Sequence, residues 1–342
     1  MARSLAQPPL FAAIILALLV SACTPAAGPD PDWTRFRSHF ILPDGRLVDR
    51  GQDGISHSEG QGFALLLAVH YDDPATFASV WKWTRSHLQT RPDKLLSWSW
   101  SAAGGLRDSN NATDGDLLVA WALGRAGKRW KNPRYLEEAQ LIAREVREKL
   151  LRNNSRGPLL LPGMDGFENS GRLVLNLSYW VFPALQELER LDPAPEWQSL
   201  RTTGIALIRE SRFGRWGLTS DWIDLAETPL PAADFPDRFG YDAIRIPLYL
   251  MWAGLDTPEL LEPYRNYWSY FKGAGFMPSW TDLSDDSIDS YDASPGIHAI
   301  AKLTLAAPNF SRVALPALNP DSGYYSSALL LLCKAMLAER SR

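Results

Sequence analysis

The chain has 342 residues, of which 46% are hydrophobic and 22% charged, and its formal net charge is −4. This length suits one large domain or two small ones, and the composition is that of a globular protein with a substantial core. The mildly negative charge argues against a nucleic acid or an anionic lipid surface as the partner. Tryptophan is abundant, with 14 residues, and its rings can line a sugar-binding groove as well as fill a core.

The N-terminal segment has the pattern of an export signal. Arg3 provides a positive start, and the apolar run 10–20 is too short for a permanent membrane span. The stretch that ends in Cys23 resembles the lipobox of bacterial lipoproteins, so we predict a signal peptide at 1–22 and a flexible tether at 23–32 that begins with lipidated Cys23. An ordinary signal peptide with a chance cysteine is the alternative. The resemblance implies an exported protein anchored by lipid on the periplasmic side, in the outer membrane.

The remainder, 33–342, is predicted to be a single all-α domain. Apolar residues recur every three or four positions, and small polar residues or proline mark several helix starts. Strand signals are few, with one short strand possible at 215–220. The expected helices are 33–40, 59–71, 74–88, 114–126, 133–152, 173–190, 196–212, 242–253, 258–272, 292–306 and 322–339.

Eleven helices of this length can stack as hairpins around a closed ring, or form an irregular bundle. The long polar connections are expected to gather at one end of a ring and form a groove, because functional residues concentrate on loops that a rigid scaffold positions. These connections are 41–58, 89–113, 153–172 and 213–241.

Three acidic clusters stand where the long connections meet helices. Glu59 opens an apolar helix, and the glycines at 60 and 62 would let a bulky ligand approach its carboxyl group. Asp114 and Asp116 begin a later helix, and Asp242 begins another with Arg245 one turn further on. Each acid could simply be a helix cap, a first-turn charge or half of an ion pair. The neighbouring histidine at 57 is expected to form hydrogen bonds or lie at the surface.

Together the clusters match the chemistry of glycosidic-bond hydrolysis, which needs one protonated carboxyl group and one ionised carboxylate. Glu59 has apolar neighbours and other carboxylates nearby, so we expect its pKa to be raised. Asp242, bonded to Arg245 and to a tyrosine hydroxyl, is expected to stay ionised.

The stretches 58–62, 112–123 and 241–245 resemble, in this order, motifs of glycoside hydrolase family 8, and especially its members from bacterial cellulose-synthesis operons. The resemblance implies an (α/α)6 barrel and an inverting hydrolase with Glu59 as general acid and Asp242 as general base. It also implies that Asp114 grips and distorts the sugar, while Tyr241 and Arg245 hold Asp242 and the attacking water. Inversion implies carboxyl groups about 6.5–9.5 Å apart.

Further side chains are expected to bind the substrate, the aromatic ones as platforms for sugar rings. They are Trp98, Trp100, Asp116, Tyr179 and Trp222.

The predicted function is therefore a secreted endo-β-1,4-glucanase, a cellulase, linked by the resemblance to the cellulose synthesis and export machinery. Hydrolysis of this kind implies no metal or organic cofactor, only water. Xylan, chitosan or a mixed-linkage glucan remain alternative substrates. A glycan-binding lipoprotein without catalysis is a further alternative, although the presence of all three acids argues against it. A polysaccharide lyase would instead need a different catalytic set and a basic groove for an acidic polymer.

Overall fold

A computed structural model describes residues 29–169 and 171–341. The predicted signal peptide and Cys23 lie outside these residues. Within them, no helix combines the length and the apolar character that a membrane crossing requires. The first helix begins two residues earlier than expected, because the Asp30 side chain accepts the N–H groups of Asp32 and Trp33 and Pro31 stands at its first position.

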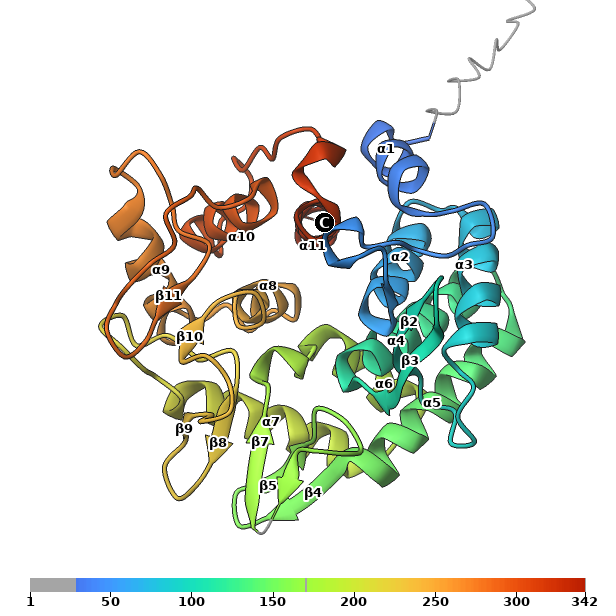
Figure 1. Cartoon of the computed structure of the whole chain (residues 1–342), viewed down its shortest axis with the longest axis horizontal. Coiled ribbons are helices and arrows are strands. Elements are labelled where there is room, and N and C mark those ends of the chain that lie inside the picture. Colours follow the sequence, from blue (N-terminus) through green and yellow to red (C-terminus); the bar gives the residue numbers. More distant parts are fainter. Residues whose placement is uncertain (1–28, 170, 342) are drawn as a thin grey trace, which may run out of the picture.

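Helices dominate the described part of the chain, as predicted (Figure 1). They are α1 (Pro31–Phe40), α2 (Ser58–His70), α3 (Pro74–His87), α4 (Thr113–Arg129), α5 (Pro133–Leu150), α6 (Phe182–Leu191), α7 (Pro195–Glu210), α8 (Arg245–Trp252), α9 (Pro258–Phe271), α10 (Pro295–Ala306) and α11 (Tyr324–Arg340). Three short 3-10 helices accompany them, at Arg50–Gln52, Leu177–Tyr179 and Pro320–Ser322.

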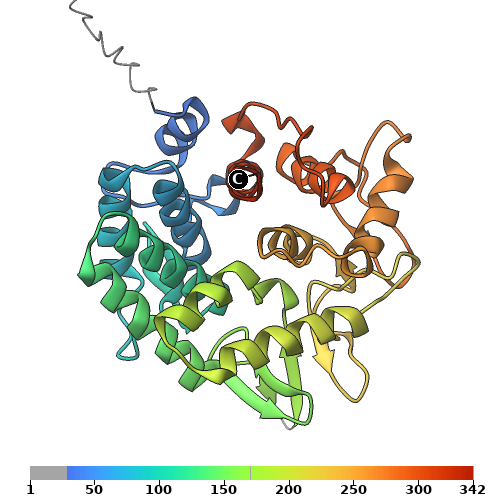
Figure 2. The same cartoon turned by 180° about the vertical axis from the view of Figure 1, so that it is seen from behind.

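Six of these helices close a ring. In ring order α2, α4, α6, α8, α10 and α11 each contact the next, and α11 returns to α2. Outside them α3 packs on α2, α5 on α4, α7 on α6, α9 on α10 and α1 on α11. Figure 1 looks down this ring and Figure 2 shows it from behind. The arrangement is the (α/α)6 barrel that the resemblance implies.

Hydrophobic patterning explains which helices lie inside. In α2 every residue from Gly60 to Val69 is buried, as expected for a helix that is covered on all sides. In the outer helix α5 the buried residues form one stripe at three- and four-residue spacing, namely Ala139, Ile142, Ala143, Val146 and Leu150.

Short antiparallel strands are more frequent than predicted. They form four small sheets in the orders β1-β2-β3, β4-β5, β6-β7-β8-β9 and β10-β11. Their bounds are β1 (Ser56–His57), β2 (Ser97–Ser101), β3 (Gly105–Asn111), β4 (Leu151–Asn154), β5 (Gly157–Leu160), β6 (Glu168–Asn169), β7 (Arg172–Leu175), β8 (Ile223–Leu225), β9 (Leu230–Pro231), β10 (Arg238–Phe239) and β11 (Thr281–Asp282).

Two sequence predictions are wrong in detail. The segment 173–190 is not one helix, because Leu173–Leu175 pairs with β8 and α6 starts only at Phe182, with a proline in its first turn. The segment 215–220 forms no strand; one isolated bridge between Phe213 and Leu218 encloses a turn there.

The strands matter because they lead into the acidic clusters. β1 runs directly into α2 and Glu59, and β3 ends just before α4 and Asp114. β10 precedes the turn 241–244, so Asp242 lies in a turn ahead of α8 and not in the helix itself.

Candidate active site

A cleft of about 910 Å³ opens where these strand–helix junctions meet, a size typical of ligand sites. The three acids that the sequence singled out line it together. The rest of its wall combines tryptophan and tyrosine rings with small and polar side chains. The lining includes His57, Glu59, Trp98, Asp114, Tyr179, Tyr241, Asp242, Arg245, Tyr291, Tyr324 and Tyr325.

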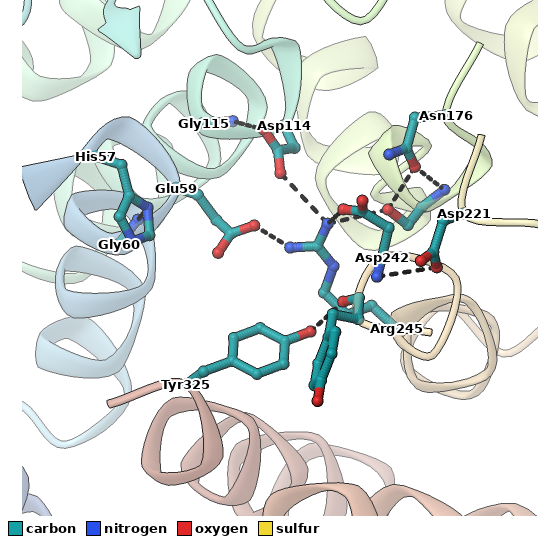
Figure 3. A network of polar contacts seen from close by, with 12 residues as sticks. His57, Glu59, Gly60, Asp114, Gly115, Asn176, Asp221, Asp242, Arg245 and Tyr325 are labelled. Atoms are coloured by element: carbon teal, nitrogen blue, oxygen red, sulfur yellow. Dashed lines mark hydrogen bonds and ion pairs between the residues drawn. The ribbon is translucent and has the colours of Figure 1, made fainter. Parts of the chain in front are cut away.

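One guanidinium group joins the three carboxylates (Figure 3). Arg245 is only 2% exposed, and its Nη1 donates to Glu59 Oε2. Its Nη2 donates to Asp242 Oδ1 at 2.8 Å and to Ser178 Oγ at 3.0 Å, and lies 3.7 Å from Asp114 Oδ2. Arg245 therefore holds acids from three different junctions around one point.

Close packing between α2 and α4 brings Glu59 and Asp114 together. A Cβ atom on Gly115 would lie 2.6 Å from Ser58 Cβ, and one on Gly62 would lie 2.6 Å from Leu118 Cβ. The expectation that Gly62 makes room for a ligand is therefore wrong, because this glycine faces a neighbouring helix. Its role is to let two helix backbones approach each other closely.

Asp221 fixes the turn that carries Asp242. Its buried carboxylate accepts the backbone N–H groups of Gly240, Asp242 and Ala243 at 3.0, 3.1 and 2.8 Å. It also accepts from Arg238 Nε at 3.0 Å. A role was predicted only for the neighbouring Trp222, because an acid ahead of a turn gives no signal of its own that it organises that turn.

The electrostatics of the ligand-free site differ from the prediction. Burial raises the pKa of Glu59, but the charge of Arg245, together with smaller contributions from His57 and Asp114, outweighs burial, so the pKa is lowered overall. Burial raises the pKa of Asp242 to about 7 against the effect of Arg245, and the charges of Asp221 and Glu59 add to this. Burial and the Glu59 charge also raise the pKa of Asp114 well above its usual value. The pKa of Glu59 is thus lowered and that of Asp242 raised, the reverse of the expectation. The reason is that Arg245 pairs with Glu59 as well as with Asp242.

Among the predicted platforms, Trp98 and Tyr179 line the cleft. Trp98 is held by its indole N–H, which donates to Asp108 at 2.7 Å. Trp100 lies away from the lining, packed edge-on to Trp83 with the Arg46 guanidinium over its ring. Its predicted sugar contact is therefore not supported by its position.

Trp222 is also outside the cleft lining. It stacks on Phe167 and on Phe235, with ring centroids 5.6 and 4.4 Å apart. These rings occupy the indole surface that a sugar would need. Trp222 does contact Tyr179 edge-on, with ring centroids 5.9 Å apart. Its observed role is therefore to hold Tyr179, which lines the cleft, in place.

Asp116 does not face the cleft, which corrects its predicted role in substrate binding. It is fully buried and accepts the Leu96 N–H and the Asn111 side-chain amide, both at 2.7 Å. Asp116 therefore anchors the β2–β3 hairpin that presents Trp98.

Tyr241 lines the cleft, but its hydroxyl group pairs with that of Tyr291 at 3.1 Å. The tyrosine hydroxyl expected on Asp242 is therefore engaged elsewhere in this structure. The Tyr241 carbonyl accepts from the hydroxyl of Tyr325.

The segments around Tyr291 and Tyr324 were missed as parts of the site. They bring Ser279, Tyr291, Asp292, Tyr324 and Tyr325 to the cleft, whereas the predicted connection 153–172 contributes nothing to its lining. The paired tyrosines at the start of the last apolar helix, Tyr324 and Tyr325, were the available signal. Within the part of the chain that the structure describes, no group of three His, Cys, Asp or Glu side chains is arranged to hold a metal ion.

Comparison with known proteins agrees with this geometry. A "probable endoglucanase" of Novacetimonas hansenii is 40% identical over 97% of this chain and 99% of its own length, and an endoglucanase of Cellulomonas uda is 35% identical over 83% and 80%. The solved endo-β-1,4-glucanase CMCax of Acetobacter xylinum superposes with a TM-score of 0.85 at 40% identity, covering 91% of this chain and 98% of that one. The family model of glycosyl hydrolases family 8 matches residues 8–339. The chain therefore belongs to glycosyl hydrolases family 8.

Proposed function

We propose that this enzyme is an endo-β-1,4-glucanase, a cellulase, that hydrolyses β-1,4-glucan with inversion. The observation that carries the proposal is the convergence of Glu59, Asp114 and Asp242 on Arg245 in an aromatic-lined cleft. Two separated carboxyl groups are what glycosidic hydrolysis requires. The names of the relatives point to the same polymer.

In the proposed reaction Glu59 donates a proton to the glycosidic oxygen as the bond to the anomeric carbon breaks. Asp242 accepts a proton from a water molecule, whose oxygen attacks that carbon from the opposite face. Asp114 binds the hydroxyl groups of the sugar at the cleavage point. Arg245 keeps Asp242 oriented through their 2.8 Å contact. The separation of the Glu59 and Asp242 carboxyl groups stays a prediction of about 6.5–9.5 Å.

The opposite pKa shifts of Glu59 and Asp114 bear on where the catalytic proton resides before substrate binds. Against burial, the Arg245 charge contributes to lowering the pKa of Glu59, whereas burial and the Glu59 charge raise the pKa of Asp114, so we infer that Asp114 carries the proton. A sugar whose hydroxyl groups donate to Asp114 favours the ionised form of that carboxyl group. We therefore infer that substrate binding moves the proton from Asp114 to Glu59, where the reaction needs it.

The test uses the protein from Pro29 onward and its Glu59→Gln variant on carboxymethyl-cellulose and cello-oligosaccharides, with the product anomer followed by proton NMR. The α-anomer from the unmodified protein alone supports an inverting glucanase with Glu59 as its acid. The β-anomer contradicts inversion. Binding without cleavage by both proteins supports a glycan-binding protein, and a lack of binding directs the search to xylan, chitosan and mixed-linkage glucan.

We further propose that the enzyme is exported and anchored by lipid on Cys23 at the periplasmic side of the outer membrane, where it trims nascent cellulose beside the synthesis and export machinery. The apolar run before Cys23 supports export and attachment of the lipid; the role in cellulose trimming rests on the likeness to endoglucanases. A Cys23→Ser variant should lose incorporation of labelled fatty acid and move from the membrane to the soluble periplasmic fraction. Equal membrane association of both forms would contradict the anchor.

A further inference from the structure

His57 is a buried residue of the cleft that the reaction above does not use. It stands immediately before α2, and its side chain caps that helix, because Nδ1 accepts the Gly60 N–H at 3.0 Å (Figure 3). An acceptor nitrogen carries no proton, so the ring is neutral with its proton on Nε2. The cap joins His57 to Gly60 in the first turn of α2, and Glu59 lies between these two residues.

Asp49 stands on the other side of the ring. Its Oδ2 lies 3.9 Å from His57 Nε2, a nitrogen that is buried and has no hydrogen-bond partner. The carboxylate is itself held in place, by the N–H of Gly51 and the side-chain amide of Gln52, both at 2.9 Å. Asp49 is thus placed to favour the tautomer with the proton on Nε2.

The remaining surroundings of the ring complete its environment. Tyr324 of α11 packs edge-on against it, with ring centroids 5.6 Å apart. Glu59 of α2 feels the charge of His57 when the ring is protonated. The titratable groups that face the ring are therefore Asp49, Glu59 and Tyr324, and all of them line the cleft.

Building on the proposed function, we propose that His57, oriented by Asp49, is a positioning residue that holds Glu59 in place through its cap on the first turn of α2. The cap depends on the bare lone pair of Nδ1, which accepts the Gly60 N–H. Loss of the cap frees the turn that carries Glu59, so the carboxyl group moves away from the glycosidic oxygen and activity falls.

Kinetics of three variants test this role. His57→Ala should lower kcat by about tenfold with little change in KM, because a small misplacement of the acid is costly. His57→Asn should restore most of kcat, since its amide oxygen can cap the helix. His39→Asn, at an exposed site, should change nothing.

A spectroscopic measurement tests the placement without relying on activity. The chain has five histidines, so the His57 ring nitrogens can be assigned by loss of their signals in His57→Asn. At pH 7.5 the nitrogen shifts should show a protonated Nε2 and a bare Nδ1, and Asp49→Asn should weaken this preference.

A protonated Nδ1 at pH 7.5 would overturn the proposal. So would a folded His57→Asn that is as slow as His57→Ala, or a His57→Ala with unchanged kcat. An unmodified protein that cleaves no glucan would contradict the proposed function instead, while the nitrogen shifts would still decide whether His57 caps α2.

Discussion

Arg245 determines the charge balance of the site at the scale of single residues. A buried cation among three acids is stable only because each side offsets the cost of removing the other from water. Its planar fork allows the two terminal nitrogens to serve Glu59 and Asp242 separately. A lysine has one compact ammonium group and cannot maintain both contacts.

Arg245→Lys is therefore expected to lower kcat by about 100-fold although the charge is retained, because the two reacting carboxyl groups lose their shared support. Initial rates on carboxymethyl-cellulose measure this. The matched control is Arg37→Lys, at a half-exposed ion pair with Asp73, which should leave the rate unchanged. Near-normal activity of Arg245→Lys would show that charge alone is enough.

The pH dependence of the free enzyme follows from Asp242. Burial and the Asp221 charge raise its pKa to about 7, and the base works only when ionised. We therefore expect kcat/KM to fall as pH drops through about 7, since kcat/KM reports ionisations of the free enzyme. Asp221→Asn removes a negative neighbour and should move this limb to lower pH. A limb with its midpoint near pH 4 in the unmodified enzyme would contradict the raised pKa.

At the scale of elements, the crossing of α2 and α4 sets the geometry of the site. Gly115→Ala would force a Cβ atom against Ser58, so the two helix starts must separate. Overpacking of this kind costs about 1–3 kcal/mol of folding free energy, and kcat should fall as well because Glu59 and Asp114 move apart. Chemical denaturation and initial rates measure both effects. Gly273→Ala, where a Cβ would meet nothing within 4 Å, is the control and should be neutral.

The elements that the sequence predicted well are those with long periodic patterns, such as the buried helices α2 and α4. The three acids were recognisable from their positions where long connections meet helices, and the barrel from the family motifs. Strands of two to seven residues give too short a pattern to recognise, and the Glu59 pKa depends on a contact with Arg245 that lies 186 residues away. The orientation of Asp116 was predictable, because residues two apart on a helix point about 200° away from each other.

Ring closure is the feature that belongs to the whole molecule. Asp32 of α1 pairs with Lys334 of α11, and its other carboxylate oxygen accepts the Leu318 N–H at 2.9 Å. Arg125 of α4 and Trp252 of α8 both donate to Glu339, near the end of α11. The last helix is thus tied to three other helices by carboxylates, so the stability of the barrel depends on their ionisation.

Two groups of acids make stability depend on pH in opposite directions. The pKa of Asp114 is raised well above its usual value, and burial raises those of Asp116 and Asp242 to about 7. These acids keep protons in the folded state that the unfolded chain releases above about pH 4, so stability should fall as pH rises from about 4 to 7. Against the effect of burial, contacts with His70 and Arg125 lower the pKa of Glu339 to about 2, so its contribution is lost as pH falls from about 4.5 towards 2.

The two effects together predict maximal stability near pH 4–5 instead of at neutrality. Thermal unfolding from pH 3 to 8 should give a Tm that is higher at pH 5 than at pH 8. In Asp116→Asn, which mimics the protonated acid and releases no proton on unfolding, the difference between these two Tm values should shrink. A Tm that rises steadily from pH 5 to pH 8 would mean that the buried acids are ionised in the folded barrel, and the proton assigned to Asp114 would then be absent before substrate binds.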